Sequence, residues 1–325
     1  MPATPLIIVE SPKKAKTINA FMNGAFQVKA TVGHFRDLPK KDLGVNLDTF
    51  EAQYVCEGRG AETQQTLRQE IAKASHVYLA TDLDREGEAI AWHLVEEFGL
   101  RAGQWDRIVY TEVTEKAVRA ALAQPVPLNI EKVEAQQARR ILDRIIGYPI
   151  SSILRQQSGQ NLSAGRVQSV ALLLIVQREK EIRGHVPIPH FLVKHKLQDS
   201  NVVFEAKWDT SDYVSDEAPY ITDPALAKQA AQLSQLRVAQ SEKKPQKRNP
   251  PAPFITISMQ QAASNALNAS VEDTMRAAQQ LFDAGAITYH RTDNPNLSEE
   301  AVDQIRALIA ENMGQEVLPE KAPTF

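Results

Sequence analysis

Residues 76–88 read His-Val-Tyr-Leu-Ala-Thr-Asp-Leu-Asp-Arg-Glu-Gly-Glu, a compact β-favouring run that leads directly into a cluster of acidic side chains. Asp82 and Asp84 are two residues apart on an extended segment, so both carboxylates can face the same side, and Glu86 opens the helix that follows. Three close carboxylates repel one another, and a hard divalent cation relieves this repulsion. Because Mg²⁺ combines one or two protein carboxylates with phosphate oxygens, the stretch predicts a magnesium site at the edge of an α/β sheet.

The same acids also have a purely structural interpretation. Asp and Glu are common in the first turn of a helix, where they cap the backbone and complement the helix dipole. The helix expected over residues 85–98 begins in this cluster. One acid alone would favour capping, whereas three acids behind a strand leave both interpretations open.

A further acid stands near the N-terminus, in the stretch Leu6-Ile7-Ile8-Val9-Glu10-Ser11-Pro12-Lys13-Lys14-Ala15-Lys16. This stretch reads as a buried strand that breaks at Pro12 into a basic helix. If the two strands are neighbours in a parallel sheet, Glu10 faces the acidic cluster and Lys14 supplies a counter-charge that can hold a phosphate. Taken alone, Glu10 and Lys14 would be an ordinary strand end beside solvated lysines.

The stretch from Val133 to Tyr148 has a helical pattern in which Arg140, Arg144 and Tyr148 recur every four residues. This spacing puts two guanidinium groups and an aromatic ring on one helix face. Flat cations and rings stack on unpaired bases, which suits a groove for single-stranded nucleic acid. The alternative is a solvated face in which the arginines form salt bridges to Glu134 and Asp143.

A small-residue turn follows, with the sequence Ser163-Ala164-Gly165-Arg166-Val167-Gln168-Ser169. Exposed amides and an arginine gather there at the expected start of a helix, where backbone phosphates bind well. The apolar run Val170 to Val176 is far too short to span a membrane, so we expect it to pack in a core.

Composition is that of an ordinary soluble, multidomain protein, with 325 residues, 43% hydrophobic and 24% charged. The net charge of -3 argues against a protein that coats DNA by bulk electrostatics, but it is compatible with a local basic groove. Cys56 is the single cysteine, so this chain can build neither an internal disulfide nor a four-cysteine zinc site. No secretion signal opens the sequence. We therefore expect a cytoplasmic protein that makes no contact with a membrane. We also expect it to be a monomer associated with the nucleoid.

The chain resembles the type IA DNA topoisomerase family, and it is closer to the bacterial topoisomerase I members than to the topoisomerase III members. The blocks that carry the resemblance follow the family's order over nearly the whole chain. They are Val9-Glu10-Ser11-Pro12 with Lys14, Gly33-His34-Phe35-Arg36-Asp37-Leu38-Pro39, residues 81–92 (TDLDREGEAIAW), residues 135–140 (AQQARR), residues 162–169 (LSAGRVQS) and Ile287-Thr288-Tyr289-His290-Arg291-Thr292-Asp293.

The resemblance implies that Tyr289 is the nucleophile, which becomes joined to a 5′ phosphate of single-stranded DNA. Without it, Tyr289 would be one of 7 tyrosines, most of which serve packing. A phenol with a pKa near ~10 needs a phosphate already neutralised by cations. The resemblance also implies that Arg291 contacts that phosphate and that Glu10 protonates the departing 3′ oxygen. It places Lys14 among the catalytic residues. It implies that Mg²⁺ is held by an acidic set comprising Glu10, Asp82, Asp84 and Glu86.

The expected DNA contacts come from four of these blocks and from the helical stretch that continues to Tyr148. They are His34, Arg139, Arg140, Arg144, Tyr148, Ser163, Ala164, Gly165, Arg166, Val167 and Gln168, together with Arg291. A lone histidine is more often a hydrogen-bonded structural residue, and for His34 only the family pattern favours a DNA contact.

We expect a multidomain chain of α/β and helical parts. The resemblance implies a Toprim α/β domain over residues 1–124, a helical domain for single-stranded DNA over 125–185 and a winged-helix-like domain with the tyrosine over 254–325. Alternating residues over 191–197 and 202–208 predict paired strands of a β-rich arch within 186–253. Two helices are expected within 258–285, the second opened by Ser270. The family continues past Phe325, so the chain looks like an amino-terminal fragment, and His290 stands where the family usually has Met or Pro.

The predicted function is cleavage and religation of one DNA strand through a 5′-phosphotyrosine link, which relaxes negatively supercoiled DNA. It requires Mg²⁺ but no ATP, consistent with the absence of a G-x-x-x-x-G-K-[ST] phosphate loop from the sequence. Two alternatives stay open. A Toprim nuclease or primase would use Glu10, Asp82 and Asp84 without Tyr289, and a non-catalytic DNA-binding fragment would use the groove alone.

Overall fold

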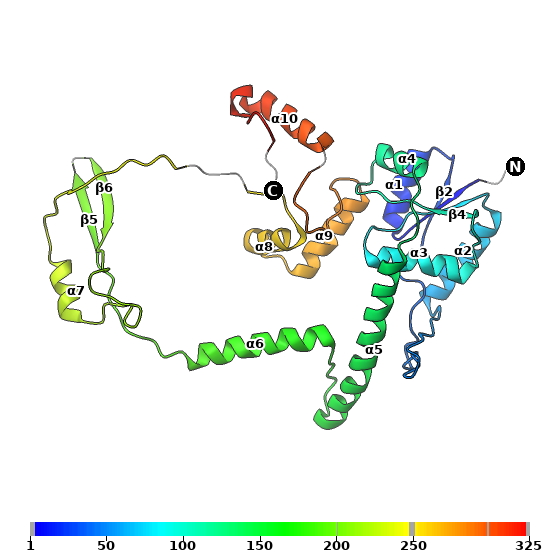
Figure 1. Cartoon of the computed structure of the whole chain (residues 1–325), viewed down its shortest axis with the longest axis horizontal. Coiled ribbons are helices and arrows are strands. Elements are labelled where there is room, and N and C mark those ends of the chain that lie inside the picture. Colours follow the sequence, from blue (N-terminus) through cyan, green and yellow to red (C-terminus); the bar gives the residue numbers. More distant parts are fainter. Residues whose placement is uncertain (1–3, 200, 247–250, 298, 323–325) are drawn as a thin grey trace. The chain divides into compact units, whose positions relative to one another are not determined.

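The computed structural model describes residues 4–199, 201–246, 251–297 and 299–322. The chain divides into two compact units, which we describe separately (Figure 1). The first unit comprises Met1–Arg166 together with Pro250–Phe325, and the second comprises Val167–Asn249. In the described part of the chain, no helix is long and apolar enough to cross a membrane.

The first unit is built on a four-stranded parallel sheet with the strand order β2-β1-β3-β4. Strand β1 pairs with β3 in the register Ile8↔Leu79, so the two strands expected from the sequence are indeed neighbours. The strands are β1 Leu6–Val9, β2 Gln27–Ala30, β3 Val77–Leu79 and β4 Trp105–Arg107. The helices around them are α1 Pro12–Met22, α2 Arg59–Lys73, α3 Arg85–Phe98 and α4 Glu115–Ala123.

Strand β1 is buried on both faces, as its unbroken apolar run predicts for a parallel strand. Ile7 and Val9 face one apolar cluster, which also contains Phe282 and Tyr289 from far along the chain. Leu6 and Ile8 face a second cluster, formed with residues of α2 and α3. The sheet therefore has a hydrophobic core on each side, and the tyrosine segment contributes to one of them.

Helix α3 begins where the sequence predicts. Asp84 is its N-cap and accepts a hydrogen bond of 2.9 Å from the backbone nitrogen of Gly87. Strand β3 ends at Leu79, so Asp82 lies in the connection between strand and helix rather than in the strand itself. Gly87 packs so closely on this connection that an added Cβ would lie 2.2 Å from the Asp82 carbonyl oxygen. A side chain at position 87 would therefore force the Asp82 backbone to shift.

The long helix α5 (Ile130–Ser158) packs against α3. Asn129 caps it, and the Asn129 backbone nitrogen donates to Glu88 Oε2 over 3.1 Å. Gln136 reaches Glu86 over 3.0 Å. The helix runs well beyond the predicted stretch, through Pro149. These contacts place the predicted arginine face of α5 beside the loop that follows β2.

Helices from the end of the chain complete the first unit. They are α8 Thr256–Leu267, α9 Val271–Asp283 and α10 Glu299–Met313, followed by a short 3₁₀ helix, η1 Gln315–Val317. Ser270 caps α9 by accepting from the backbone nitrogen of Asp273, which confirms the predicted helix pair and its boundary. Ser298, the expected cap of the last helix, lies outside the described residues.

The second unit contains most of α6 (Arg166–Gly184), the antiparallel pair β5 (Lys194–Asp199) and β6 (Val202–Lys207), and α7 (Pro224–Ala231). The predicted strand pair is confirmed. The expectation that residues 170–176 pack in a core is wrong, because α6 has no buried residue and Leu174 is 61% exposed. An apolar run indicates that a helix can pack against another element, but it does not show which element, if any, covers the helix.

Candidate active site

The carboxyl ends of β1 and β3 bring Glu10 and Asp82 together. The backbone nitrogen of Asp82 donates a hydrogen bond of 2.9 Å to Glu10 Oε1. Burial, and next the negative charge of Asp82, raise the pKa of the Glu10 carboxyl to about 8, although the charge of Lys14 opposes this shift. The Glu10 side chain is therefore an acid that keeps its proton at neutral pH in the absence of a cation.

Lys14 is fully buried and forms an ion pair with the carboxylate of Asp82. Its Nζ also lies 5.0 Å from the centre of the Phe282 ring, which adds a cation–π contact. The predicted counter-charge thus points at the acidic cluster. It reaches Asp82 from the first turn of α1.

Asp84 faces the tyrosine segment. Arg291 Nη1 lies 3.1 Å from Asp84 Oδ2. Burial pushes the pKa of Asp84 upward, but the hydrogen bond from Gly87 and the closeness of Tyr289 and Arg291 outweigh it and hold the pKa below its usual range. Asp84 is therefore an ionised group that both caps α3 and pairs with Arg291.

Tyr289 is 8% exposed and lies beside these carboxylates. Its ring packs edge-on against Phe282, with 5.1 Å between ring centres, and its backbone nitrogen donates to the Thr111 carbonyl over 2.8 Å. Burial, followed by the charges of Asp82 and Asp84, raises the pKa of the Tyr289 hydroxyl well above its usual range. Among the described residues, this hydroxyl has no hydrogen-bond partner of normal geometry.

The neighbouring His290 is also buried, at 5% exposure. Within the described part of the chain, neither of its ring nitrogens has a hydrogen-bond partner. Burial, with the charge of Arg291, lowers the pKa of His290, so its ring is neutral near pH 7. The residue that departs from the family pattern thus packs directly against the nucleophile candidate, with 5.4 Å between the two ring centres.

Sequence reasoning missed Arg107 and Glu88. The Arg107 side chain is fully buried and donates to the carbonyl oxygens of Leu79, Thr81 and Asp82 at 3.0, 2.9 and 2.8 Å. It also pairs with Glu88 over 2.9 Å. The available signal was an arginine next to the apolar pair 108–109, where a charge needs a buried partner. Arg107 holds the backbone that carries Asp82.

Glu86 is placed differently from the other acids. It accepts a hydrogen bond from Gln136 of α5, and its Oε2 lies 3.3 Å from Nε2 of His34, which belongs to the loop that follows β2. No three His, Cys, Asp or Glu side chains among the described residues are already grouped as metal ligands. The oxygen donors of Asp82, Asp84 and Glu10 nevertheless suit a hard cation, with Lys14 and Arg291 now supplying the positive charge.

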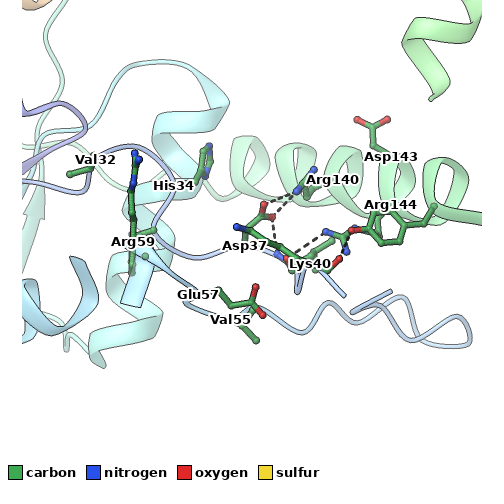
Figure 2. A pocket seen from close by; sticks show the side chains of 14 residues that line it. Val32, His34, Asp37, Lys40, Val55, Glu57, Arg59, Arg140, Asp143 and Arg144 are labelled. Atoms are coloured by element: carbon green, nitrogen blue, oxygen red, sulfur yellow. Dashed lines mark hydrogen bonds and ion pairs between the residues drawn. The ribbon is translucent and has the colours of Figure 1, made fainter. Parts of the chain in front are cut away.

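Three of the predicted DNA-contact residues of α5, Arg140, Arg144 and Tyr148, line a pocket of about 590 Å³, which we call the first pocket (Figure 2). Asp37 and Arg140 face one another across it with two bonds of 2.8 and 2.6 Å. The Arg140 bond and that of the Leu38 amide hold the pKa of Asp37 low against the effect of burial. His34 also lines this pocket. Arg139 pairs with Asp143, at 3.7 Å, within α5.

Arg144 is buried and Tyr148 is exposed, but both are held by contacts with the loop that follows β2. Arg144 is 5% exposed and donates to the carbonyl oxygens of Pro39 and Asp42 at 2.5 and 2.9 Å. Its guanidinium lies 4.2 Å from the centre of the Tyr148 ring, and the Tyr148 hydroxyl bonds to the Lys40 carbonyl. Both residues line the first pocket and also hold its loop in place.

The turn predicted to bind phosphate, residues 163–168, lies where the chain leaves the first unit after Arg166. Ala164 exchanges two hydrogen bonds with Ser151, and Arg166 pairs with Asp143 over 3.2 Å. Ser163 is exposed and Gly165 is half-buried. The remaining two predicted residues, Val167 and Gln168, belong to the second unit, where both are exposed.

Two models of known protein families match this chain. The Toprim domain model matches residues 5–115, which hold the parallel sheet, and the model described as DNA topoisomerase matches residues 127–325. The chain belongs to the type IA DNA topoisomerase family. This membership also confirms the resemblance found from the sequence blocks, and it identifies the four-stranded unit as a Toprim fold.

Individual members of the topoisomerase family agree. DNA topoisomerase 1 of Pseudomonas aeruginosa is 41% identical over 98% of this chain and 41% of its own length, and the Escherichia coli protein is 41% identical over 97% and 40%. A solved structure, full-length topoisomerase I from Thermotoga maritima, superposes with a TM-score of 0.82 at 36% identity, covering 97% of this chain and 54% of the other. The chain thus spans well under half the length of these two curated relatives.

Proposed function

We propose that this chain carries the strand-cleaving and strand-joining chemistry of a type IA topoisomerase. The observation that carries the proposal is the position of Tyr289 and Arg291 directly beside Asp82 and Asp84. A DNA strand laid over this site would present a phosphate to the Tyr289 hydroxyl, with the Arg291 guanidinium able to contact its oxygens. Tyr110 also lies near Asp82 and Glu10, but its hydroxyl already donates a hydrogen bond of 3.1 Å to the Ala80 carbonyl oxygen.

In the proposed step, Tyr289 Oη forms a bond to phosphorus and loses its proton to water. The bond from phosphorus to the 3′ oxygen breaks, and this oxygen takes a proton from the Glu10 carboxyl. Attack of the 3′ hydroxyl on the phosphotyrosine reverses both changes, so the bond energy is retained and no ATP is needed. Lys14 positions Asp82 and keeps a positive charge near the reacting phosphate.

Magnesium fits this arrangement at Asp82 and Asp84, with Glu10 close by. Its chemistry there would be neutralisation of the phosphate charge, which electrostatic stabilisation of the transition state requires. Glu86 is the weakest of the four predicted ligands, because its contacts run to Gln136 and His34. Its role as a ligand stays a prediction.

The bound DNA would be single-stranded. The first pocket offers Arg140, Arg144 and Tyr148 to an unpaired base, while His34 and Arg139 stand nearer the acidic cluster. The turn at 163–168 would contact the backbone. In the whole protein, which would act in the cytoplasm as a monomer, these parts would form the Toprim, helical, arch and winged-helix-like domains and would relax negatively supercoiled DNA.

The test is to trap the covalent intermediate. The protein is mixed with Mg²⁺ and labelled single-stranded DNA and then denatured. We expect label attached to the protein, lost in Tyr289→Phe and kept in Tyr213→Phe, a matched change at an exposed tyrosine of the second unit. Free nicks that persist in Tyr289→Phe would identify a nuclease, and binding without label or nicks would identify a non-catalytic fragment.

A further inference from the structure

A second pocket of about 260 Å³ lies next to the first and shares His34, Asp37, Arg140 and Asp143 with it. These shared residues are labelled in Figure 2. Six further residues line it, namely Glu86, Gln136 and Arg139 together with Arg36, Tyr54 and His93. No step of the proposed chemistry uses the last three. We call this cavity the second pocket. It is large enough for a tetrahedral oxyanion with accompanying water, since one water takes up about 30 Å³.

Each of these three side chains carries a buried polar atom without a hydrogen-bond partner among the described residues. The atoms are Nε and Nη1 of Arg36, the hydroxyl of Tyr54 and Nδ1 of His93. His93 is 3% exposed. An unpaired buried polar group is costly, so native proteins rarely leave one, yet three side chains of this kind line the same cavity.

The acids that line the second pocket are already paired. Asp37 is bound by Arg140, Asp143 by Arg139 and Arg166, and Glu86 by Gln136 with His34 close by. Paired carboxylates repel an incoming anion much less than free ones do. The lining therefore does not exclude a negative ligand.

Arg36 retains unused donors for a different reason. Its Nε lies 3.4 Å from Glu97 Oε2, which is an ion pair without hydrogen-bond geometry. This Nε has no hydrogen-bond partner among the described residues. Glu97 is shared, because Gln64 and Arg68 also bind it. The Arg36 guanidinium lies 5.6 Å from the centre of the Tyr54 ring, and its Nε and Nη1 have no hydrogen-bond partner among the described residues.

His93 supplies a neutral donor. Burial, and then the nearby charge of Arg36, lower the pKa of His93 to about 3, so the ring is uncharged at neutral pH. A neutral imidazole can carry its proton on Nδ1 and donate from it. The second pocket thus presents one guanidinium, one phenol and one imidazole, all able to donate to the same oxygen-rich group.

We propose that the second pocket binds a phosphate group through Arg36, Tyr54 and His93. A guanidinium with two hydrogen-bond donors beside it is a typical recognition set for a tetrahedral oxyanion. The phosphate belongs either to the backbone of the DNA strand or to free inorganic phosphate. The first source rests on the proposed function, whereas binding of the free ion needs neither Tyr289 nor DNA.

Trp92 reports on the pocket, because its ring centre lies 4.9 Å from that of His93 and 6.1 Å from that of Tyr54. The full chain is titrated with inorganic phosphate at constant ionic strength, followed by tryptophan fluorescence and calorimetry. We expect saturable binding that weakens about tenfold or more in Arg36→Gln and in Tyr54→Phe, since each loses a bond to a charged group. Tyr54→Phe keeps the ring, so it serves even if Arg36→Gln folds poorly.

Arg68→Gln is the matched control. Arg68 also pairs with Glu97 but does not line the second pocket, so its loss should leave phosphate binding unchanged. Equal weakening in Arg68→Gln would reveal general surface attraction and would overturn the proposal. A second result would also overturn it. If phosphate at millimolar concentration does not bind saturably, and the unchanged protein, Arg36→Gln and Tyr54→Phe bind the oligonucleotide equally well, the cavity holds only water.

A short single-stranded oligonucleotide separates the two sources. If the oligonucleotide displaces inorganic phosphate and binds more weakly to Arg36→Gln, the natural ligand is a backbone phosphate. If phosphate remains bound beside saturating oligonucleotide, the ligand is the free ion. Both results support the pocket. Repeating the phosphate titration with Tyr289→Phe keeps this test apart from that of the proposed function, because the pocket should survive the loss of the nucleophile.

Discussion

The Ser11 hydroxyl donates a hydrogen bond of 2.6 Å to Asp283 Oδ2, a residue 272 positions later in the chain. Ser11 follows Glu10 directly and caps α1, while Asp283 ends α9 just before the tyrosine segment. Two further bonds run in parallel, from Lys13 to the Gln280 carbonyl and from Thr17 to the Asp283 carbonyl. This group of bonds fastens the end of α9, the helix that precedes the tyrosine segment, to the first turns of α1.

Replacing Asp283 should loosen this attachment. Asp283 is 4% exposed, so Asp283→Ala removes a buried, charge-assisted hydrogen bond and should cost about 2 kcal/mol of unfolding free energy, together with part of the covalent DNA adduct. Urea denaturation and adduct trapping measure the two effects. Gln279→Ala, which removes only the neighbouring intrahelical partner of Asp283, should cost much less. Equal losses in the two variants would show that the long-range bond has no special role.

Arg107→Lys should destabilise the first unit severely. Lysine keeps the charge but cannot reach the carbonyl oxygens of Leu79, Thr81 and Asp82 together with Glu88, so buried acceptors are left unpaired. Breaking such a buried network typically costs about 3–5 kcal/mol. Denaturation followed by circular dichroism measures the loss. A near-normal unfolding midpoint would contradict the assigned role of Arg107.

Gly87→Ala should uncouple cleavage from folding. The added methyl group would overlap the Asp82 backbone, which has to shift and carry its carboxylate with it. We expect a folded protein with far less covalent adduct and a raised requirement for Mg²⁺, measured by trapping over a range of metal concentrations. Gly184→Ala is the control, because nothing lies within 4 Å of its added carbon. An unchanged adduct yield in Gly87→Ala would mean that the position of Asp82 tolerates this shift.

Stability should depend on pH through His93. The unfolded chain takes up a proton at this side chain near 6.5, but in the folded chain burial lowers the pKa to about 3. The unfolded state therefore binds more protons between these values, so stability is fully present above 6.5 and falls as the pH drops toward 3. The loss should approach about 1 kcal/mol per pH unit. Urea unfolding at several pH values should give a flatter profile for His93→Gln; an equally steep one would assign the dependence to other groups.

The sheet and the acidic edge were predictable because their signals are local. Unbroken apolar runs mark β1, and the spacing of Asp82 and Asp84 behind a strand marks the carboxyl edge. Pairing of β1 with β3 then follows, and with it the meeting of Glu10 and Asp82. The pattern also predicted the helix pair that precedes Tyr289, through its cap at Ser270.

Other features were beyond sequence reasoning because they depend on distant partners. The four-residue spacing of Arg140, Arg144 and Tyr148 predicts a shared face, but it does not reveal that Arg144 binds the carbonyl oxygens of Pro39 and Asp42. Arg107 was missed because its acceptors are backbone atoms, which carry no sequence signal. The DNA-binding roles of these arginines stay a prediction.

The packing of Tyr289 on Phe282 has a thermal consequence. Both rings belong to the apolar cluster that includes Ile7 and Val9 of the sheet, so the nucleophile is also part of a hydrophobic core. Any movement that withdraws Tyr289 far enough to let a strand pass must wet this apolar surface, and wetting apolar surface raises the heat capacity. The enthalpy of such an opening would then increase with temperature, and a van 't Hoff plot of its equilibrium constant would be curved rather than straight.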